Sequence, residues 1–207
     1  MNILLVYPEY PDTFWSFKHS LKFIAKKAAF PPLGLLTVAA MLPGDWEKKL
    51  VDLNVEPLTD EHLDRADMVL LSAMIVQKES VRQIIARCKG LGKKIVAGGP
   101  LFTTQHDQFA GIDHFVLNEA EITLPLFLRD LAAGHGQPVY SSTERPDISK
   151  TPVPLWSLID LGNYATMSIQ YSRGCPFNCE FCDIIIMNGR IPRLKSAEQM
   201  QREFQAL

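Results

Sequence analysis

The chain has 207 residues, of which 47% are hydrophobic and 21% charged, which predicts a globular protein of one or two domains. Its formal charge of −2 gives no electrostatic basis for binding nucleic acid. The longest apolar stretch, residues 30–43, is too short to cross a bilayer, so we expect no transmembrane segment. The N-terminus also lacks the basic region and the cleavage site of a secretory signal.

Short apolar runs alternate with helical patterns along the first 133 residues. Several runs are continuously apolar, as in parallel strands that are buried on both faces. The predicted strands cover residues 2–7, 49–55, 68–74, 94–97 and 114–117, and the predicted helices cover residues 33–41, 79–89 and 122–133. Strands that alternate with helices predict an α/β domain at residues 1–133, with a Rossmann-like, doubly wound parallel sheet of about five strands.

The sequence changes character after this domain. Four prolines, Pro138, Pro146, Pro152 and Pro154, are spread through polar sequence, which is typical of an extended segment. We therefore predict that residues 134–164 link two domains.

The last part, residues 165–207, is predicted to begin a second domain. Apolar residues alternate with others over residues 165–171, which predicts a strand that leads directly into a loop rich in cysteine. Ser196 is a suitable N-cap, and residues 197–207 are predicted to form the helix that follows it.

The loop contains Cys175, Cys179 and Cys182 in the spacing C-x3-C-x2-C, with Phe181 directly before the last cysteine. Three thiolates on one loop can ligate three irons of a [4Fe–4S] cluster and leave the fourth iron open, whereas electron-transfer clusters use four cysteines. The alternatives are structural thiols or a zinc site, but zinc needs a fourth ligand and no His or Cys follows. The fourth cysteine, Cys88, is expected in the core. So few cysteines do not predict a disulfide framework and fit a reducing cytoplasm.

Two groups of charged residues have simple interpretations. Glu119 and Glu121 follow a predicted strand and are expected to cap the next helix, although carboxylates there could also serve as acid and base groups. Arg190, Arg193 and Lys195 form a basic cluster after the cysteines, which we interpret as a solvated face, although it could also help to hold an anionic group near the cysteines.

The cysteine motif resembles the signature of the radical S-adenosylmethionine (SAM) enzymes. In that family SAM binds the open iron, and an electron from the cluster cleaves it to a 5′-deoxyadenosyl radical. The resemblance implies that Cys175, Cys179 and Cys182 ligate the cluster and that Phe181 lies beside the adenine of SAM. It also implies a cytoplasmic enzyme with an electron donor such as flavodoxin or ferredoxin.

The first domain resembles the cobalamin-binding domain, whose pattern is Ser-x-Leu followed one βαβ unit later by Gly-Gly. Here the equivalent residues are Ser72, Met74, Gly98 and Gly99. The resemblance implies that Ser72 bonds the lower-ligand base of cobalamin and that the glycines leave room for it. Because ligands bind beyond the carboxyl ends of parallel strands, we expect further contacts at the end of the fifth strand. The complete set of expected cobalamin contacts is Ser72, Met74, Gly98, Gly99, Asn118 and Glu119.

One departure from the cobalamin pattern concerns the cobalt ligand. Many cobalamin domains have Asp-x-His-x-x-Gly after the first strand, but residues 9–14 contain neither histidine nor glycine. Either cobalamin binds without a histidine ligand (His-off), or the domain has lost the cofactor. His19 is nearby, but we expect it to be a surface or packing residue.

The segment Pro-Pro-Leu-Gly-Leu at residues 31–35 resembles the cobalamin-dependent radical SAM enzymes, in particular the branch that contains the hopanoid methylases. This resemblance implies a methyltransferase that acts on an unactivated carbon of a small-molecule or lipid-like substrate. The alternatives are a cyclase that carries out a rearrangement, a non-catalytic module that binds cobalamin or a cluster, and an interaction domain.

The length of the second domain differs from what this resemblance implies. A partial barrel of six βα units takes roughly 180 residues at about 30 per unit. Only 41 residues remain from Met167. We therefore expect the chain to contain only the first βα unit of a partial TIM-like barrel and to be inactive by itself.

Overall fold

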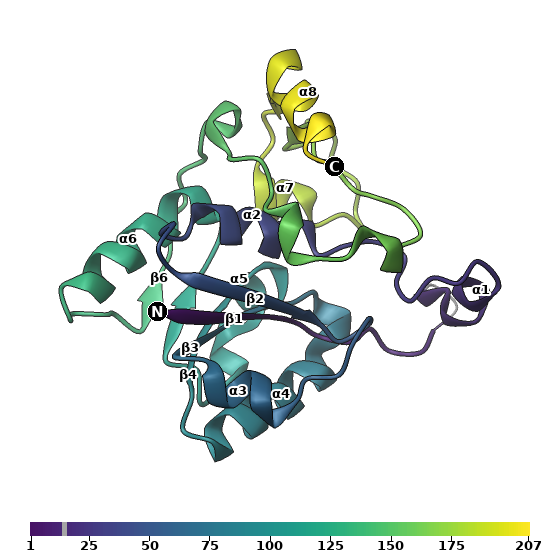
Figure 1. The fold of residues 1–207 in the computed structure, drawn as a ribbon. Helices are drawn as coiled ribbons and strands as arrows, with labels where there is room; N and C mark the ends of the chain where they lie inside the picture. The colour runs from purple at the N-terminus through teal and green to yellow at the C-terminus, as the bar shows by residue number, and fades with distance from the viewer. Residues whose placement is uncertain (14–15) are drawn as a thin grey trace.

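A computed structural model describes residues 1–13 and 16–207. Within this described part, six parallel strands form one sheet in the order β2-β1-β3-β4-β5-β6 (Figure 1). The strands are β1 (Asn2–Tyr7), β2 (Glu47–Asp52), β3 (Met68–Ser72), β4 (Lys94–Gly98), β5 (His114–Val116) and β6 (Val139–Tyr140). The Rossmann-like α/β fold predicted from the sequence is confirmed.

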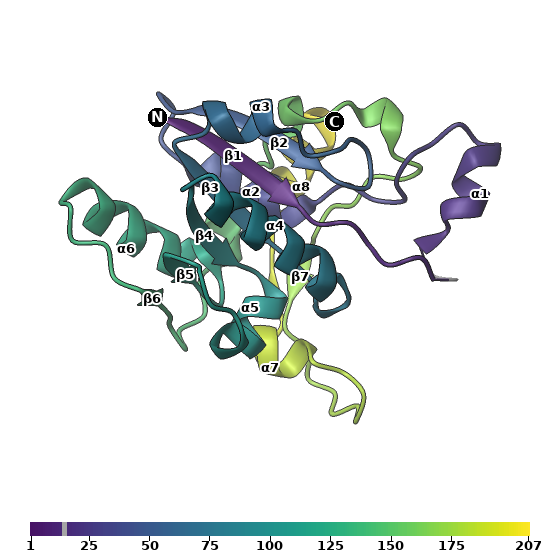
Figure 2. The same cartoon turned by 90° about the horizontal axis from the view of Figure 1, so that it is seen from below.

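Helices cover both faces of the sheet and give it two cores (Figure 2). One face packs against α3 (Asp60–Arg65), α4 (Lys78–Gly90) and α5 (Pro100–Gln105), and the other against α2 (Leu33–Met41) and α6 (Ala120–Ala132). Central strands are apolar on both sides, and Ile3, Leu4, Leu5 and Val6 of β1 are all buried. This burial explains why the strand patterns are continuous rather than alternating.

The predicted elements of the first domain are all present, with bounds that move by a few residues. In the described part of this domain, three α-helices were not predicted. They are α1 (Lys18–Phe23), α3 and α5, each only six residues long. Such short helices contain too few turns for a helical period to be recognised. Among the described residues, no helix is both long and apolar enough to span a membrane.

The segment predicted to be a linker is folded onto the sheet. It contributes β6 to the edge of the sheet, and Trp156 is buried with α2 and α6 in the core on their face. The backbone N–H of Leu155 donates to the carbonyl of Leu36 in α2 at 3.0 Å. Three short 3-10 turns lie in this segment, at Ile148–Lys150, Trp156–Leu158 and Leu161–Asn163. Two more lie in the first domain, at Ile75–Gln77 and His106–Gln108. The division into domains remains a prediction, but the segment is not an extended chain.

The predicted strand at residues 165–171 is wrong, because these residues, all of them described, have no strand conformation. Met167 and Ile169 alternate as expected, yet both pack against the core that contains α2 and α6. Among the described residues, backbone hydrogen bonds to neighbouring chain are found only at the ends of this segment, from Ala165 and Thr166 to residues 28 and 29 and from Lys195 to Tyr171. A strand needs a continuous ladder of such bonds. The periodicity therefore indicates packing here rather than a strand.

The strand lies further on. β7 (Ser172–Arg173) pairs antiparallel with β8 (Arg193–Leu194), so the C-terminal part begins with a two-stranded ribbon rather than with a parallel βα unit. The ribbon encloses the cysteine loop and α7 (Ile184–Asn188). The last helix, α8 (Ala197–Gln205), is confirmed, and the Ser196 hydroxyl caps it by accepting from the N–H of Gln199 at 3.1 Å.

Candidate functional site

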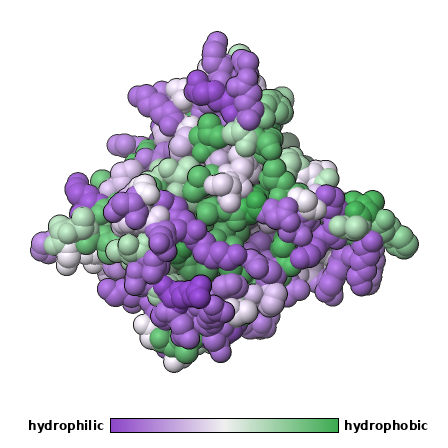
Figure 3. Space-filling view, viewed as in Figure 1, coloured by the Kyte–Doolittle hydropathy of each residue, from purple (hydrophilic) through white to green (hydrophobic). Residues whose placement is uncertain are grey.

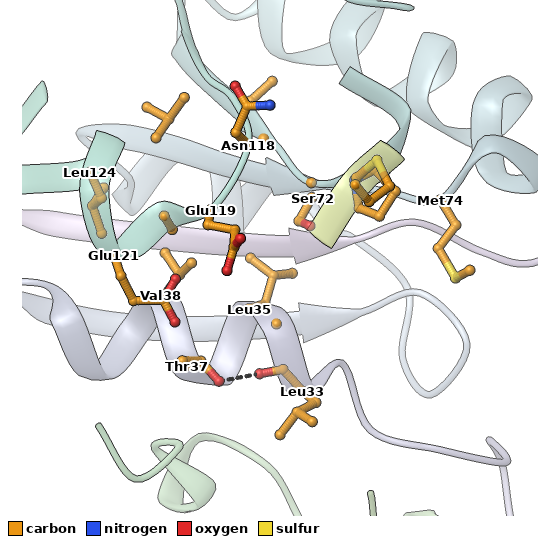
Figure 4. A pocket seen from close by; sticks show the side chains of 18 of the residues that line it. Leu33, Leu35, Thr37, Val38, Ser72, Met74, Asn118, Glu119, Glu121 and Leu124 are labelled. Carbon is orange, nitrogen blue, oxygen red and sulfur yellow. Dashed lines mark hydrogen bonds between the residues drawn. The ribbon is translucent and has the colours of Figure 1, made fainter. Parts of the chain in front are cut away.

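A cavity of about 550 Å³ lies above the carboxyl ends of β3, β4 and β5, on the face covered by α2 (Figure 4). Its size is typical of a small-molecule or cofactor site. Its walls are mostly apolar and include Leu33, Val38, Met41, Leu70, Val96, Val116 and Leu124. Part of the rim is formed by α7, so the cavity lies between the sheet and the segment that follows the cysteines.

The six residues predicted to contact a cofactor all line this cavity. They are Ser72, Met74, Gly98, Gly99, Asn118 and Glu119. Parallel strands bring their carboxyl ends to the same edge of a sheet. This is why residues from three separate strand ends meet here although they are far apart in the sequence.

Ser72 and the two glycines form the floor of the cavity. A Cβ on Gly98 would lie 2.6 Å from the carbonyl oxygen of Val116, and a Cβ on Gly99 would lie 2.5 Å from the hydroxyl oxygen of Ser72. Gly99 also has a φ of +85°, which side chains other than glycine rarely adopt. Among the described residues the Ser72 hydroxyl has no hydrogen-bond partner, so it is available to a ligand.

The loop after β1 contains a tyrosine near the position at which the cobalt-binding pattern has its histidine. The hydroxyl groups of Tyr10 and Tyr7 are hydrogen-bonded at 2.7 Å, and the Tyr10 hydroxyl donates to the sulfur of Met74 at 3.5 Å. Phe14, the last residue of the compared stretch, lies outside the described residues. His19 is exposed on α1, which lies beyond the carboxyl ends of β1 and β2 (Figure 1).

Glu119 is the N-cap residue of α6 and Glu121 lies in its first turn, as predicted, but both carboxylates also form ion pairs that were not predicted. Among the described residues the Glu119 side chain makes no cap to α6. Its carboxylate, only 5% exposed, pairs instead with Arg173 at 2.9 Å, Arg193 at 2.7 Å and Arg145 at 3.4 Å. Glu121 pairs with Arg173 at 2.8 Å. Figure 4 shows both carboxylates among the residues around the cavity.

The predicted solvated basic face is therefore wrong for two of its three residues. Arg193 belongs to the ion-pair network, and Lys195 is buried in an ion pair with Glu203 of α8. Only Arg190 is exposed, and it donates to the side-chain oxygen of Asn178 at 2.8 Å. Sequence alone could not find the partner of Arg193, because it lies far away along the chain.

The cysteine loop is open to solvent. All four cysteines, each within the described part of the chain, carry free thiols, and Cys179 is exposed. Phe181, the predicted neighbour of the SAM adenine, is 91% exposed and lies outside the cavity lining. Nowhere in the described chain do three His, Cys, Asp or Glu side chains gather in a metal-binding arrangement. The three thiols thus share a loop without converging.

The loop is nevertheless tied to the cavity. The N–H of Cys175 donates to the carbonyl of Gly189 at 3.1 Å, which closes the base of the loop. Directly after Cys182, Asp183 and Ile184 line the cavity, as do Met187 and Asn188 further along α7. The cysteine loop and one wall of the cavity are therefore parts of one continuous segment.

Two arginines of this network received no predicted role. Arg145 donates to the carbonyls of Met187 at 2.6 Å and Ile186 at 3.1 Å, at the end of α7. Arg173 stands two residues before Cys175. Arginine is well suited to buried ion pairs, but no local sequence signal indicates these two, because Arg145 and Arg173 are 26 and 54 positions from Glu119.

The family model for the B12 (cobalamin) binding domain matches residues 25–128. This match covers half of the chain and includes α2, the ends of β3, β4 and β5, and the first part of α6. The chain belongs to the B12-binding domain family.

Relatives extend over the cysteine loop as well. An uncharacterized methyltransferase of Synechocystis is 46% identical over all of this chain, and the hopanoid C-2 methylase of Rhodopseudomonas palustris is 35% identical over 98% of it. A third relative, the anaerobic magnesium-protoporphyrin IX monomethyl ester cyclase of Synechocystis, is 26% identical over 88%. The chain spans 39% of the length of each of the first two and 42% of the third.

Proposed function

We propose that the cavity binds cobalamin, that the cysteine loop binds a [4Fe–4S] cluster with SAM, and that together they belong to a methyltransferase acting on an unactivated carbon. The observation that carries the proposal is the Ser72 hydroxyl, which has no partner among the described residues and lies beside Gly99 at the floor of a largely apolar cavity. Membership of the B12-binding family and the methyltransferase names of two relatives support it.

The residues of the cavity fit the nucleotide base of cobalamin. Ser72 provides a hydroxyl that can hydrogen-bond a ring nitrogen, and the two glycines keep the floor free of side chains. Apolar walls exclude water from the bound group. We propose His-off binding, because residues 9–13, which follow β1, contain no histidine.

The cysteine loop fits a cluster by the chemistry of its donors. Cys175, Cys179 and Cys182 are three thiols on one loop without disulfides, and Phe181 is free to stack on an adenine. When bound, a cluster with SAM supplies a radical, and cobalamin supplies the methyl group. The protein connects the two sites through α7, since this helix starts next to Cys182 and lines the cavity.

Titration with hydroxocobalamin, followed by absorbance, tests the cavity. Ser72→Ala removes one hydrogen bond, worth about 0.5–1.5 kcal/mol, so we expect binding about 2- to 12-fold weaker. Ser20→Ala, at an exposed serine on α1, is the matched control and should bind like wild type. Absence of binding by wild type, or equal binding by wild type and Ser72→Ala, would contradict the proposed site.

Anaerobic reconstitution with iron and sulfide tests the loop. Cys179→Ala should lose the [4Fe–4S] spectrum, whereas Cys88→Ala should keep it, because Cys88 is buried in α4. Equal iron uptake by wild type and Cys179→Ala would remove the basis for the cluster.

For the substrate and the reductant we propose only a chemical class. We propose a small-molecule or lipid-like substrate, as the name of the hopanoid C-2 methylase suggests, and an electron donor such as flavodoxin or ferredoxin. The relative named as a cyclase favours one second candidate, a ring-forming rearrangement with the same cofactors. Product analysis of the enzyme loaded with both cofactors distinguishes the two, because only methyl transfer moves an isotopically labelled methyl group of SAM into the product.

A further inference from the structure

Glu119 joins the sheet to both ends of the cysteine loop. It closely follows the end of β5 and lines the cavity, and its buried carboxylate accepts from Arg173 and Arg193. Arg173 belongs to β7, before the loop, and Arg193 belongs to β8, after it. One carboxylate, at the turn from β5 to α6, thus contacts the two strands that enclose the cysteines.

The same arginines hold the segment between these strands. Arg193 donates to the carbonyls of Asn188 at 2.9 Å and Pro146 at 2.8 Å, and Arg145 holds the neighbouring carbonyls of α7. Gly174, at a φ of +92°, packs so closely against the carbonyl of Ile191 that no Cβ fits between them. The base of the loop is therefore tightly packed, while its tip with Cys179 is exposed.

The balance of charge shows why Glu119 is important to the contacts at the base of the loop. Three arginines, Arg145, Arg173 and Arg193, are between 14% and 29% exposed and face two carboxylates, Glu119 and Glu121. Of these two carboxylates, Glu121 forms an ion pair with Arg173 alone among the residues that the structure describes. Within the described residues, Glu119 is thus the sole carboxylate that pairs with Arg145 and Arg193. Removal of its charge would leave these two guanidinium groups uncompensated in a partly desolvated site, which is strongly unfavourable.

We propose that Glu119 is a positioning residue that fixes the cysteine loop relative to the cavity. The inference deepens the proposed function and rests on it in one respect, namely that the loop holds a cluster and the cavity a cofactor. Glu119 acts through the arginines and not on the substrate. Its carboxylate sets the spacing and orientation between the two sites, because it belongs to the cavity lining and to the base of the loop at once.

The test uses Glu119→Gln, which keeps the size of the side chain and removes its charge. Hydrogen exchange followed by mass spectrometry needs no metal and reports on the amides of Cys175 and Lys195, which bond across the base of the loop. We expect these amides to exchange at least about tenfold faster, the change that corresponds to about 1.4 kcal/mol. Peptides from α4 serve as the internal reference, and Glu61→Gln, at an exposed ion-pair residue, is the matched control.

A second readout separates positioning from general destabilisation. After reconstitution, Glu119→Gln should still take up iron, but its cluster should show an altered electron paramagnetic resonance signal and a higher reduction potential. The potential rises because the excess positive charge of the arginines beside the loop favours the more negative, reduced cluster. If Glu119→Gln does not fold, Arg193→Gln tests the same contact from the other side and should also speed exchange at Cys175 and Lys195.

The outcomes separate the inference from the proposed function. If wild type and Glu119→Gln have equal exchange rates and identical cluster signals, the positioning role is overturned, whereas the cluster and cobalamin assignments stand. If wild type acquires no cluster, the proposed function fails, and the exchange rates alone decide whether Glu119 holds the loop. Faster exchange together with a changed cluster signal supports both.

Discussion

At the scale of single residues, Gly99 shows how closely the cavity floor is packed. Its φ of +85° and the 2.5 Å that would separate a Cβ at this position from the Ser72 hydroxyl both exclude a side chain. The sequence predicted this glycine as room for a ligand. The structure adds that the glycine is needed for the fold itself, whether or not a ligand is bound.

Gly99→Ala is therefore expected to destabilise the protein. The strained backbone alone should lower the free energy of unfolding by about 1–3 kcal/mol. Urea denaturation measures the loss, and Gly44→Ala, where nothing lies within 4 Å of the new Cβ, should change stability by no more than about 1 kcal/mol. Equal stability of the two variants would contradict the observed backbone conformation.

Glu121 makes stability depend on pH. Burial raises the pKa of its carboxyl group, but the hydrogen bonds and charge of Arg173 outweigh burial, so the pKa lies below the usual 4.5. The unfolded chain then binds more protons than the folded one as the pH falls below about this value. The stabilisation from Glu121 is thus present at neutral pH and is lost as the pH falls through the folded pKa.

Glu121→Gln should remove this contribution. At pH 7 we expect a loss of about 1–3 kcal/mol, because Arg173 loses one charged hydrogen-bond partner. The difference from wild type should shrink as the pH is lowered below about 4.5, as urea denaturation at a series of pH values would show. Glu79→Gln, at an exposed carboxylate, is the control variant. A difference between wild type and Glu121→Gln that stays constant with pH would argue against the lowered pKa.

At the scale of elements, α8 is held by polar side chains, since the buried residues of this helix are Gln199 and Glu203. Lys195 precedes the helix, Glu203 lies within it, and both are buried. Gln199 on the same helix donates to the carbonyls of Ile148 at 3.1 Å and Thr151 at 2.9 Å. The helix was predictable from its cap, but the contacts of Gln199 were not, because their partners are about 50 residues away.

Removing one charge of the Lys195–Glu203 pair should lower the free energy of unfolding more than replacing both residues by apolar ones. Glu203→Gln leaves a buried ammonium without its counter-charge, and we expect a loss of about 3–5 kcal/mol. The double variant Lys195→Met/Glu203→Leu removes both charges and should recover most of that loss. Urea denaturation compares them, with Glu198→Gln on the exposed side of α8 as the control. A double variant as unstable as Glu203→Gln would show that packing, not the charge, is decisive.

At the scale of the whole molecule, exposed hydrophobic residues are concentrated in particular regions of the surface. Figure 3 shows hydrophobic residues gathered toward the right-hand tip, where α1 projects in Figure 1, and across the middle of the same face. The cysteine loop also carries exposed apolar side chains, Phe177 at 71% and Phe181 at 91%. The sheet, in contrast, is enclosed by helices on both faces.

Binding of cobalamin to the folded chain should stabilise the whole molecule. Hydroxocobalamin at a hundred times its Kd should add about 2.7 kcal/mol to the free energy of unfolding. The thermal midpoint should rise with ligand concentration, and Ser72→Ala should need more ligand for the same rise. A midpoint that is independent of hydroxocobalamin would show that the folded chain does not bind it.

Much of this molecule can be predicted from local sequence. Apolar runs, glycines and caps are patterns among residues that are close along the chain. They predicted the parallel sheet and the helices of about ten residues, and they placed Ser72, Gly99 and Asn118 together at the carboxyl ends of the strands. The cysteine spacing likewise identifies a candidate ligand set without any structure. These features were predicted because their physical causes act within a few residues.

The tertiary structure decided which charged side chains meet. Glu119, expected to cap a helix, pairs with Arg193, expected to be solvated, although the two are 74 positions apart in the sequence. The tertiary structure also decided that residues 165–171 form no strand and that α7 lines the cavity. Burial and ion pairing depend on what the folded chain brings together, so the sequence alone determined the candidate ligand-bearing residues, and only the fold decided how they are held.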